Sequence, residues 1–480
     1  MMKRTRHGHS TRALAARRLS LAVGAVVVSF GAIVLARAHG DAPRSAPTFG
    51  TAAAHGGTRA LIDTPELEGF FALTEGAVLA HGTREVFGEL RLTAREGEGE
   101  ARRQPVALAV AVDVSGSMSG EKIAEARRAV RELAARMHPE DRLAVVVYND
   151  RSQVISPLLP IGAARETLQS RIDTLYASGG TNIPAGLSLA AEALSAAPQS
   201  MVRRLVLISD GLDGSGLAPQ QVQASVRARA GAGMTTSSLG VGVDYDERFL
   251  TGVADAGRGN YDLVAQGRAL TAFLGRELDQ ASATIADRTE LTLSLPSGWR
   301  LAEAWGAELS GNRVPLGALF SGERRRVTVR FEIAAGAPGT ASDLALALDY
   351  RAIENSRDRN VDLGRLSVRV VSEETEVAAS RDMTLHAEAV AQRVDAVQAR
   401  AVEAWREGRV AEAQQLTQDN LGMLRELSQQ APEAAPALEQ RSQALQADYD
   451  NFGTVRAESE QGRAWGLGSN SARRARQAAF

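Results

Sequence analysis

The stretch AVAVDVSGSMSG, residues 109–120, decides how the rest of the chain is interpreted. Residues 106–112 are uncharged and rich in valine, which is typical of a strand buried on both faces of a parallel sheet. Polar side chains follow at once, a carboxylate at Asp113 and hydroxyls at Ser115 and Ser117. Ligands bind at the carboxyl ends of such strands, because the connecting loops diverge there. We therefore predict a ligand site at this edge of the sheet.

Short oxygen-bearing side chains on one tight turn suit a hard divalent cation. Mg²⁺ takes oxygen ligands in near-octahedral geometry at about 2.0–2.1 Å. Mg²⁺ is favoured over Ca²⁺ because the donors are few and compact, and Mn²⁺ fits equally well. The residues alone therefore predict a divalent metal site without choosing between Mg²⁺ and Mn²⁺.

The D-x-S-x-S pattern resembles the metal-ion-dependent adhesion site of von Willebrand factor type A domains. The resemblance implies two more ligand loops, and matching residues follow in the expected order. Thr181 lies in SGGTN (residues 178–182) ahead of a predicted helix, and Asp210 follows a hydrophobic strand at 205–209. The implied metal ligands are Asp113, Ser115, Ser117, Thr181 and Asp210. By the same resemblance, the three hydroxyls touch the metal directly and the two carboxylates act mainly through water, at least when a ligand is bound.

Residues 105–287 alternate predicted strands with predicted helices, the last of them at 270–286. This order is typical of an α/β fold, a doubly wound, mostly parallel sheet with helices on both faces. From 288 to 372 apolar residues recur with a period of two, which predicts an antiparallel β domain. Residues 85–94 alternate in the same way, so we expect the segment 85–104 to pair with that later domain. The α/β domain is then an insertion in the β domain.

Residues 316–324, LGALFSGER, carry a second resemblance. They are similar to a turn of the β domain that follows the type A domain in bacterial relatives of inter-alpha-trypsin inhibitor heavy chains and calcium-activated chloride channel regulators. Together the two resemblances cover about residues 85–371. The metalloprotease domain of some channel regulators has no counterpart in this sequence, so the resemblance implies neither proteolysis nor channel function.

The two ends of the chain have different compositions. Six basic residues precede an uncharged apolar stretch at 19–36, so residues 1–38 are expected to be a signal peptide or signal anchor, cleaved or not. A linker is expected at 39–84. Residues 373–455 are predicted to be helical, either as a cap on the β domain or as a second partner-binding surface. Residues 456–480 are predicted to be a disordered tail.

The amino-acid composition argues against several classes of function. The net charge of −2 argues against a nucleic-acid partner, and the lack of cysteine excludes thiol catalysis and thiolate metal sites. The favoured function is an exported, non-enzymatic adhesion or scaffold module whose metal binds an aspartate or glutamate of a protein partner. It would be periplasmic, tethered to the inner membrane with its body outside the cytoplasm, or secreted. The alternatives are a hydrolase, or a type A subunit that assists an ATPase or chelatase assembly.

Overall fold

The computed structural model describes residues 57–96, 103–242, 245–264 and 269–459, with 461–462, 465–466 and 468–469. The predicted signal segment, the first part of the predicted linker and much of the predicted tail lie outside these residues. Within the described ranges, no helix is both long enough and apolar enough to cross a membrane.

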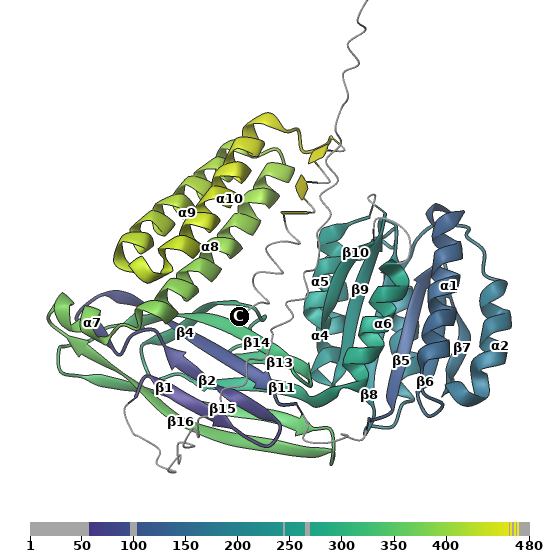
Figure 1. Ribbon diagram of the computed structural model, residues 1–480, viewed down its shortest axis with the longest axis horizontal. Coiled ribbons are helices and arrows are strands. Elements are labelled where there is room, and N and C mark those ends of the chain that lie inside the picture. The colour runs from purple at the N-terminus through teal and green to yellow at the C-terminus, as the bar shows by residue number, and fades with distance from the viewer. Residues whose placement is uncertain are drawn as a thin grey trace, which may run out of the picture. The chain divides into compact units, whose positions relative to one another are not determined.

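The predicted α/β fold is confirmed, and its sheet is centred on the quoted stretch (Figure 1). The strands are β5 (Val106–Asp113), β6 (Arg142–Tyr148), β7 (Ser152–Pro160), β8 (Val202–Ser209), β9 (Met234–Val241) and β10 (Arg258–Val264). They lie in the order β10-β9-β8-β5-β6-β7. Neighbouring strands are parallel except β6 and β7, which are antiparallel. The carboxyl ends of β5 and β8 therefore lie side by side.

Helices cover both faces of this sheet. They are η1 (Gly116–Met118), α1 (Glu121–Arg136), α2 (Ile161–Asp173), α3 (Ile183–Ser195), α4 (Pro219–Gly231), α5 (Glu247–Gly257) and α6 (Ala269–Ser282). In β5, leucine and valine at 108, 110 and 112 pack in one core with α1, α2 and α6. The alanines at 107, 109 and 111 pack in a second core with α3, α4 and α5. The alternation of size along β5 thus gives each face its own core.

The β domain is a sandwich of two five-stranded sheets. Its strands are β1 (Arg59–Asp63), β2 (Leu67–Leu73), β3 (Ala77–Leu79), β4 (Thr83–Ala94), β11 (Thr284–Ser294), β12 (Trp299–Trp305), β13 (Arg313–Phe320), β14 (Arg324–Ala334), β15 (Ala341–Ala352) and β16 (Arg357–Val371). The sheet orders are β1-β2-β4-β14-β12 and β13-β11-β15-β16-β3, and one hydrophobic core fills the space between them. β4 pairs with β14 along its whole length. The α/β domain is therefore inserted between β4 and β11.

Two predicted boundaries are wrong. The expected linker at 39–84 contains β1, β2 and β3, because alternate residues such as Ile62 and Phe71 are buried in the sandwich core. The helix expected at 270–286 ends at Ser282, because Thr284 already pairs with Phe320 at the start of β11. Residues 284–287 thus belong to the β domain.

The LGALFSGER segment is mostly a strand and not a turn. Gly317 lies inside β13 with φ +82°, and a Cβ at this position would lie 3.0 Å from Cβ of Arg258 in the α/β domain. The turn itself is confined to 321–323, where the Phe320 N–H donates to Glu323 Oε2 at 3.0 Å. A glycine is needed at 317 because this backbone conformation and this close contact both disfavour a side chain.

The C-terminal region is helical, as predicted. It contains α7 (Glu374–Ser380), α8 (Met383–Arg406), α9 (Val410–Gln430), the short η2 (Pro432–Ala434) and α10 (Ala435–Thr454). Glu388 of α8 forms ion pairs with Arg91 and Arg326 of the sandwich. The predicted disorder of the tail is wrong at Trp465, whose ring packs on that of Trp405 with centroids 4.9 Å apart.

The early strands should contribute to the stability of the sandwich. Replacing fully buried Phe71 with alanine should lower the free energy of unfolding by about 3–5 kcal/mol, because it leaves a cavity in the core. The control Leu61→Ala removes a side chain that is 62% exposed and should change it by less than about 0.5 kcal/mol. Urea denaturation followed by tryptophan fluorescence tests this, because the tryptophans lie outside residues 105–287. Equal effects of the two substitutions would contradict it.

Candidate metal centre

The carboxylate of Asp113 anchors the site at the end of β5. It is fully buried, and each of its oxygen atoms accepts a hydrogen bond. Ser115 N–H donates to Oδ1 at 2.8 Å, and Ser209 Oγ donates to Oδ2 at 2.8 Å. The first bond closes an Asx turn that redirects the chain after the strand, and the second fixes the carboxylate against neighbouring β8.

Two serine hydroxyls extend this arrangement to Asp210. Ser115 Oγ and Ser117 Oγ lie 3.0 Å apart, and Ser117 Oγ donates to Asp210 Oδ1 at 2.8 Å. Asp113, Ser115 and Asp210 are buried, whereas Ser117 is exposed. The exposed Ser117 hydroxyl thus bridges the two buried residues Ser115 and Asp210.

Thr181 joins the same site from a third loop. The Ser178 N–H donates to the Val114 carbonyl at 2.7 Å, which fixes this loop beside the end of β5. A Cβ on Gly211 would lie 3.3 Å from Thr181 Oγ1 and 3.6 Å from Ser117 Oγ. The two hydroxyls therefore converge on the backbone that follows Asp210. The structure brings all five predicted residues to one edge of the sheet.

Sequence reasoning missed two residues of this cluster. Ser209 was assigned to the end of a strand, and its hydroxyl could have been singled out because it directly precedes Asp210. Lys122, in the first turn of α1, forms an ion pair through Nζ with Asp210 Oδ2. No spacing pattern in the sequence indicates Lys122, because its ion pair with Asp210 depends on the direction in which α1 runs after η1.

The chemistry of the oxygen atoms allows a test of which cation they fit. The separations of 3.0 Å for Ser115–Ser117 and 2.8 Å for Ser117–Asp210 are those of direct hydrogen bonds, so they do not distinguish one cation from another. Hydroxyl and carboxylate oxygens are the ligands that hard divalent cations prefer. The donor set thus fits a hard divalent cation.

The charge balance of the cluster also favours a cation. In the described ranges, no group of three or more His, Asp or Glu side chains could hold a metal, and the candidate site combines two carboxylates with hydroxyl oxygens. Burial raises the pKa of Asp113, the bonds from Ser115 and Ser209 lower it, and the charge of Asp210 raises it. Burial also raises the pKa of the nearby Tyr148 hydroxyl well above its ordinary value. Of the two buried carboxylates, Asp210 is paired with the ammonium group of Lys122.

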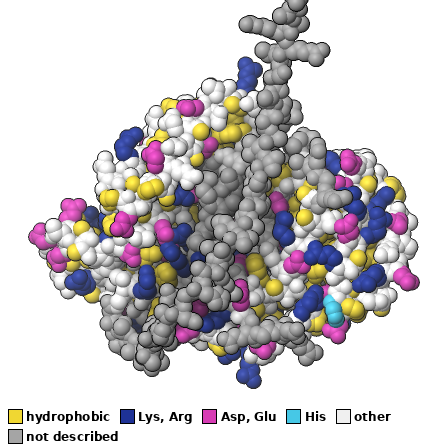
Figure 2. Space-filling model, viewed as in Figure 1, with side chains coloured by type: hydrophobic (Ala, Val, Ile, Leu, Met, Phe, Trp, Pro, Cys, Tyr) yellow, Lys and Arg dark blue, Asp and Glu magenta, His cyan; other side chains and the backbone are white. Residues whose placement is uncertain are grey.

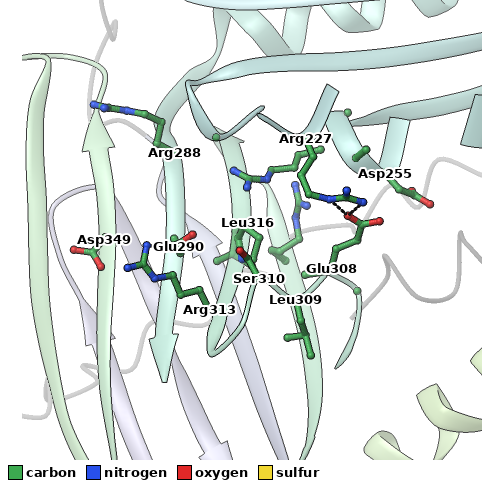
Figure 3. A pocket seen from close by; sticks show the side chains of 18 of the residues that line it. Arg227, Asp255, Arg288, Glu290, Glu308, Leu309, Ser310, Arg313, Leu316 and Asp349 are labelled. Atoms are coloured by element: carbon green, nitrogen blue, oxygen red, sulfur yellow. Dashed lines mark hydrogen bonds and ion pairs between the residues drawn. The ribbon is translucent and has the colours of Figure 1, made fainter. Parts of the chain in front are cut away.

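A separate cleft of about 1360 Å³ lies between α4 and β10 on one side and β11 and β13 on the other (Figure 3). Arg227 donates to Glu308 at 2.7 Å and Arg313 to Glu290 at 3.3 Å, so ion pairs line much of it. None of the five predicted metal ligands lines this cleft. On the face shown in Figure 2, basic and acidic side chains are interspersed over the α/β domain. The convergence of oxygen atoms, and not the size of a hollow, therefore identifies the candidate site.

Comparison with known proteins agrees with this geometry. Residues 108–212 match the family model of the von Willebrand factor type A domain. The protein YfbK of Escherichia coli (strain K12) is 29% identical over 196 residues, which are 40% of this chain and 34% of YfbK. Human inter-alpha-trypsin inhibitor heavy chain H4 is 28% identical over 159 residues, which are 31% of this chain and 17% of that protein. The chain thus spans about a third or less of these relatives.

A solved structure extends the likeness beyond the matched segment. The von Willebrand factor type A structure from Catenulispora acidiphila has a TM-score of 0.61 and 20% sequence identity. The match covers 82% of this chain and 90% of that one. The shared fold therefore includes regions outside residues 108–212.

Asp113 should lower the stability of the metal-free protein. Because burial raises its pKa above the ordinary 3.8, the ionised form is disfavoured in the fold, and stability is lost as the pH rises through the raised pKa. Asp113→Asn keeps the hydrogen-bonding shape without the charge. In EDTA at pH 7 it should melt at a higher temperature than the wild type, and the difference should shrink toward pH 4.

Calorimetric melting with and without Mg²⁺ measures this effect. Mg²⁺ should raise the melting temperature of the wild type and leave that of Asp113→Asn unchanged. A lower melting temperature for Asp113→Asn in EDTA at pH 7, or an equal response of both proteins to Mg²⁺, would contradict the assignment.

Proposed function

This chain carries a von Willebrand factor type A domain, and we propose that the domain binds a partner protein through a divalent cation. One observation carries the proposal. Hydroxyl and carboxylate oxygens from three loops converge at the carboxyl edge of the sheet. Ser117 is exposed, so a cation held there is within reach of a partner.

Each residue has a distinct task in this proposal. Ser115, Ser117 and Thr181 would touch the metal, while Asp113 and Asp210 would hold it mainly through water. Neutral hydroxyls leave the ion only partly neutralised, so the bound metal supplies an electrophilic position for a carboxylate. An aspartate or glutamate of the partner would complete the octahedron. We propose Mg²⁺ as the ion, with Mn²⁺ as the nearest substitute, because the donors are few and compact.

The alternative functions gain no support from the contacts of the site. Ser115 and Ser117 contact each other, and Ser117 donates to Asp210. A serine hydrolase needs a free base that takes the hydroxyl proton, whereas Asp210, the acceptor here, is itself paired with Lys122. No observation favours the hydrolase, or the subunit of an ATPase or chelatase assembly, over the binding module.

Partner capture should depend on the metal and on its ligands. We expect Thr181→Ala to weaken partner binding more than Mg²⁺ binding, and Ser117→Ala to weaken Mg²⁺ binding by at least about tenfold. Pull-down from a membrane extract, with and without EDTA, measures partner binding, and titration calorimetry measures Mg²⁺ affinity.

The matched control is Ser119→Ala, which removes a third hydroxyl of the same loop. Ser119 Oγ donates to the Gly116 carbonyl and not to the cluster. This variant should bind both Mg²⁺ and partner as the wild type does. Capture that is unchanged by EDTA and by Asp113→Asn would refute the proposal.

We also propose that the body of the protein lies outside the cytoplasm, either secreted or tethered to the inner membrane by residues 1–38. The support is the order of the basic and apolar residues in that segment. A reporter that is active only in the cytoplasm, fused after Arg103, should then be inactive. Full activity of this fusion would contradict export.

A further inference from the structure

Exposed apolar side chains lie on two of the loops that form the candidate metal centre. In the described part of the chain, the large hydrophobic side chains that are exposed are Leu61, Leu159, Tyr176, Leu212 and Leu217. Three of them, Tyr176, Leu212 and Leu217, lie on the two loops that carry Thr181 and Asp210, and we call these three the apolar rim. Their exposed fractions are 74%, 63% and 50%. Single exposed leucines are ordinary, but a group beside one ligand site indicates a contact surface.

Hydrogen bonds hold the apolar rim in place. Tyr176 lies two residues before Ser178, whose N–H is bound to the β5 loop. Leu212 directly follows Gly211, the residue on which the Thr181 and Ser117 hydroxyls converge.

The loop that carries Leu212 and Leu217 is tied directly to the Thr181 loop. The Gly214 N–H donates to the Thr181 carbonyl at 2.8 Å. The Ile183 N–H donates to Asp213 Oδ1 at 3.0 Å. The apolar side chains are therefore exposed on an ordered surface.

Charges near the apolar rim restrict what can bind there. Asp150 accepts from the Gly180 N–H at 2.9 Å, and Asp213 accepts from the Ile183 N–H. Both carboxylates are thus fixed beside the Thr181 loop, where they would repel a second acidic group of a partner. A single carboxylate can be neutralised at the metal, but acidic neighbours of that carboxylate would meet the carboxylates of Asp150 and Asp213.

We infer that the partner presents one carboxylate flanked by large apolar side chains, and not a run of acidic residues. The inference rests on the function proposed above. The carboxylate would reach the cation while its apolar neighbours pack on Tyr176, Leu212 and Leu217. Removing water from around the charged pair strengthens its attraction, and burial of the apolar side chains adds affinity independently.

Two synthetic peptides test the inference on the full chain by fluorescence anisotropy. One carries a single aspartate between leucines, the other a single aspartate between serines. In Mg²⁺ the leucine peptide should bind at least about tenfold more tightly, and EDTA should abolish binding of both. The double variant Leu212→Ser/Leu217→Ser should reduce the preference to less than about threefold, with unchanged Mg²⁺ affinity by calorimetry.

The control is Leu61→Ser, which removes an equally exposed leucine from β1 and should keep the full preference. Equal, Mg²⁺-dependent affinity for the two peptides would overturn the inference and leave the proposed function standing. Leucine-peptide binding that persists in EDTA would overturn both. Failure of both peptides to bind while Mg²⁺ binds would overturn the inference, and the pull-down would then decide the proposed function.

Discussion

The burial of the Asp113 carboxylate is the constraint on which the site depends. A charged group without water must be satisfied by hydrogen bonds or by a cation. Two bonds hold its oxygen atoms, one from the backbone of its own turn and one from the end of β8. These bonds join two neighbouring strands at their carboxyl ends. They determine where the serine hydroxyls and Asp210 lie, so the donor geometry follows from the way one buried charge is accommodated.

Much of the fold could be predicted from sequence because its signals are local. The valine-rich run of β5 and the alternating strands after residue 288 follow from periodicity alone. The ligand residues were found through a resemblance, since Thr181 and Asp210 are distant in sequence from Asp113. Lys122 escaped prediction because its ion pair depends on the direction of α1. The strands β1 to β3 were missed because they are short and lie among alanine, glycine and threonine, so packing in the sandwich outweighs weak local preference.

The helical region shows the same dependence on tertiary contacts. Its three long helices lie within the range predicted to be helical, and Gly408, with φ +79°, lies just after the end of the first of them. The contact between α8 and the sandwich could not be predicted from the sequence. Glu388 is a charged residue in a polar helix, and such residues are usually exposed to solvent. Only the fold places it between Arg91 and Arg326. Likewise, the ring of Trp465 packs with those of Trp405 and Phe452. No local sequence pattern predicts this aromatic cluster.

The insertion of the α/β domain has a mechanical consequence. The chain enters this domain at the start of β5, and the candidate metal centre lies at the opposite end of the same strand. Tension between a bound partner and the sandwich would therefore run along the axis of β5. Hydrogen bonds to β6 on one side and β8 on the other lie across that axis. They would be loaded together in shear, and not broken one after another as in peeling, so the strand that holds the metal ligands is also the one best placed to resist a pulling force.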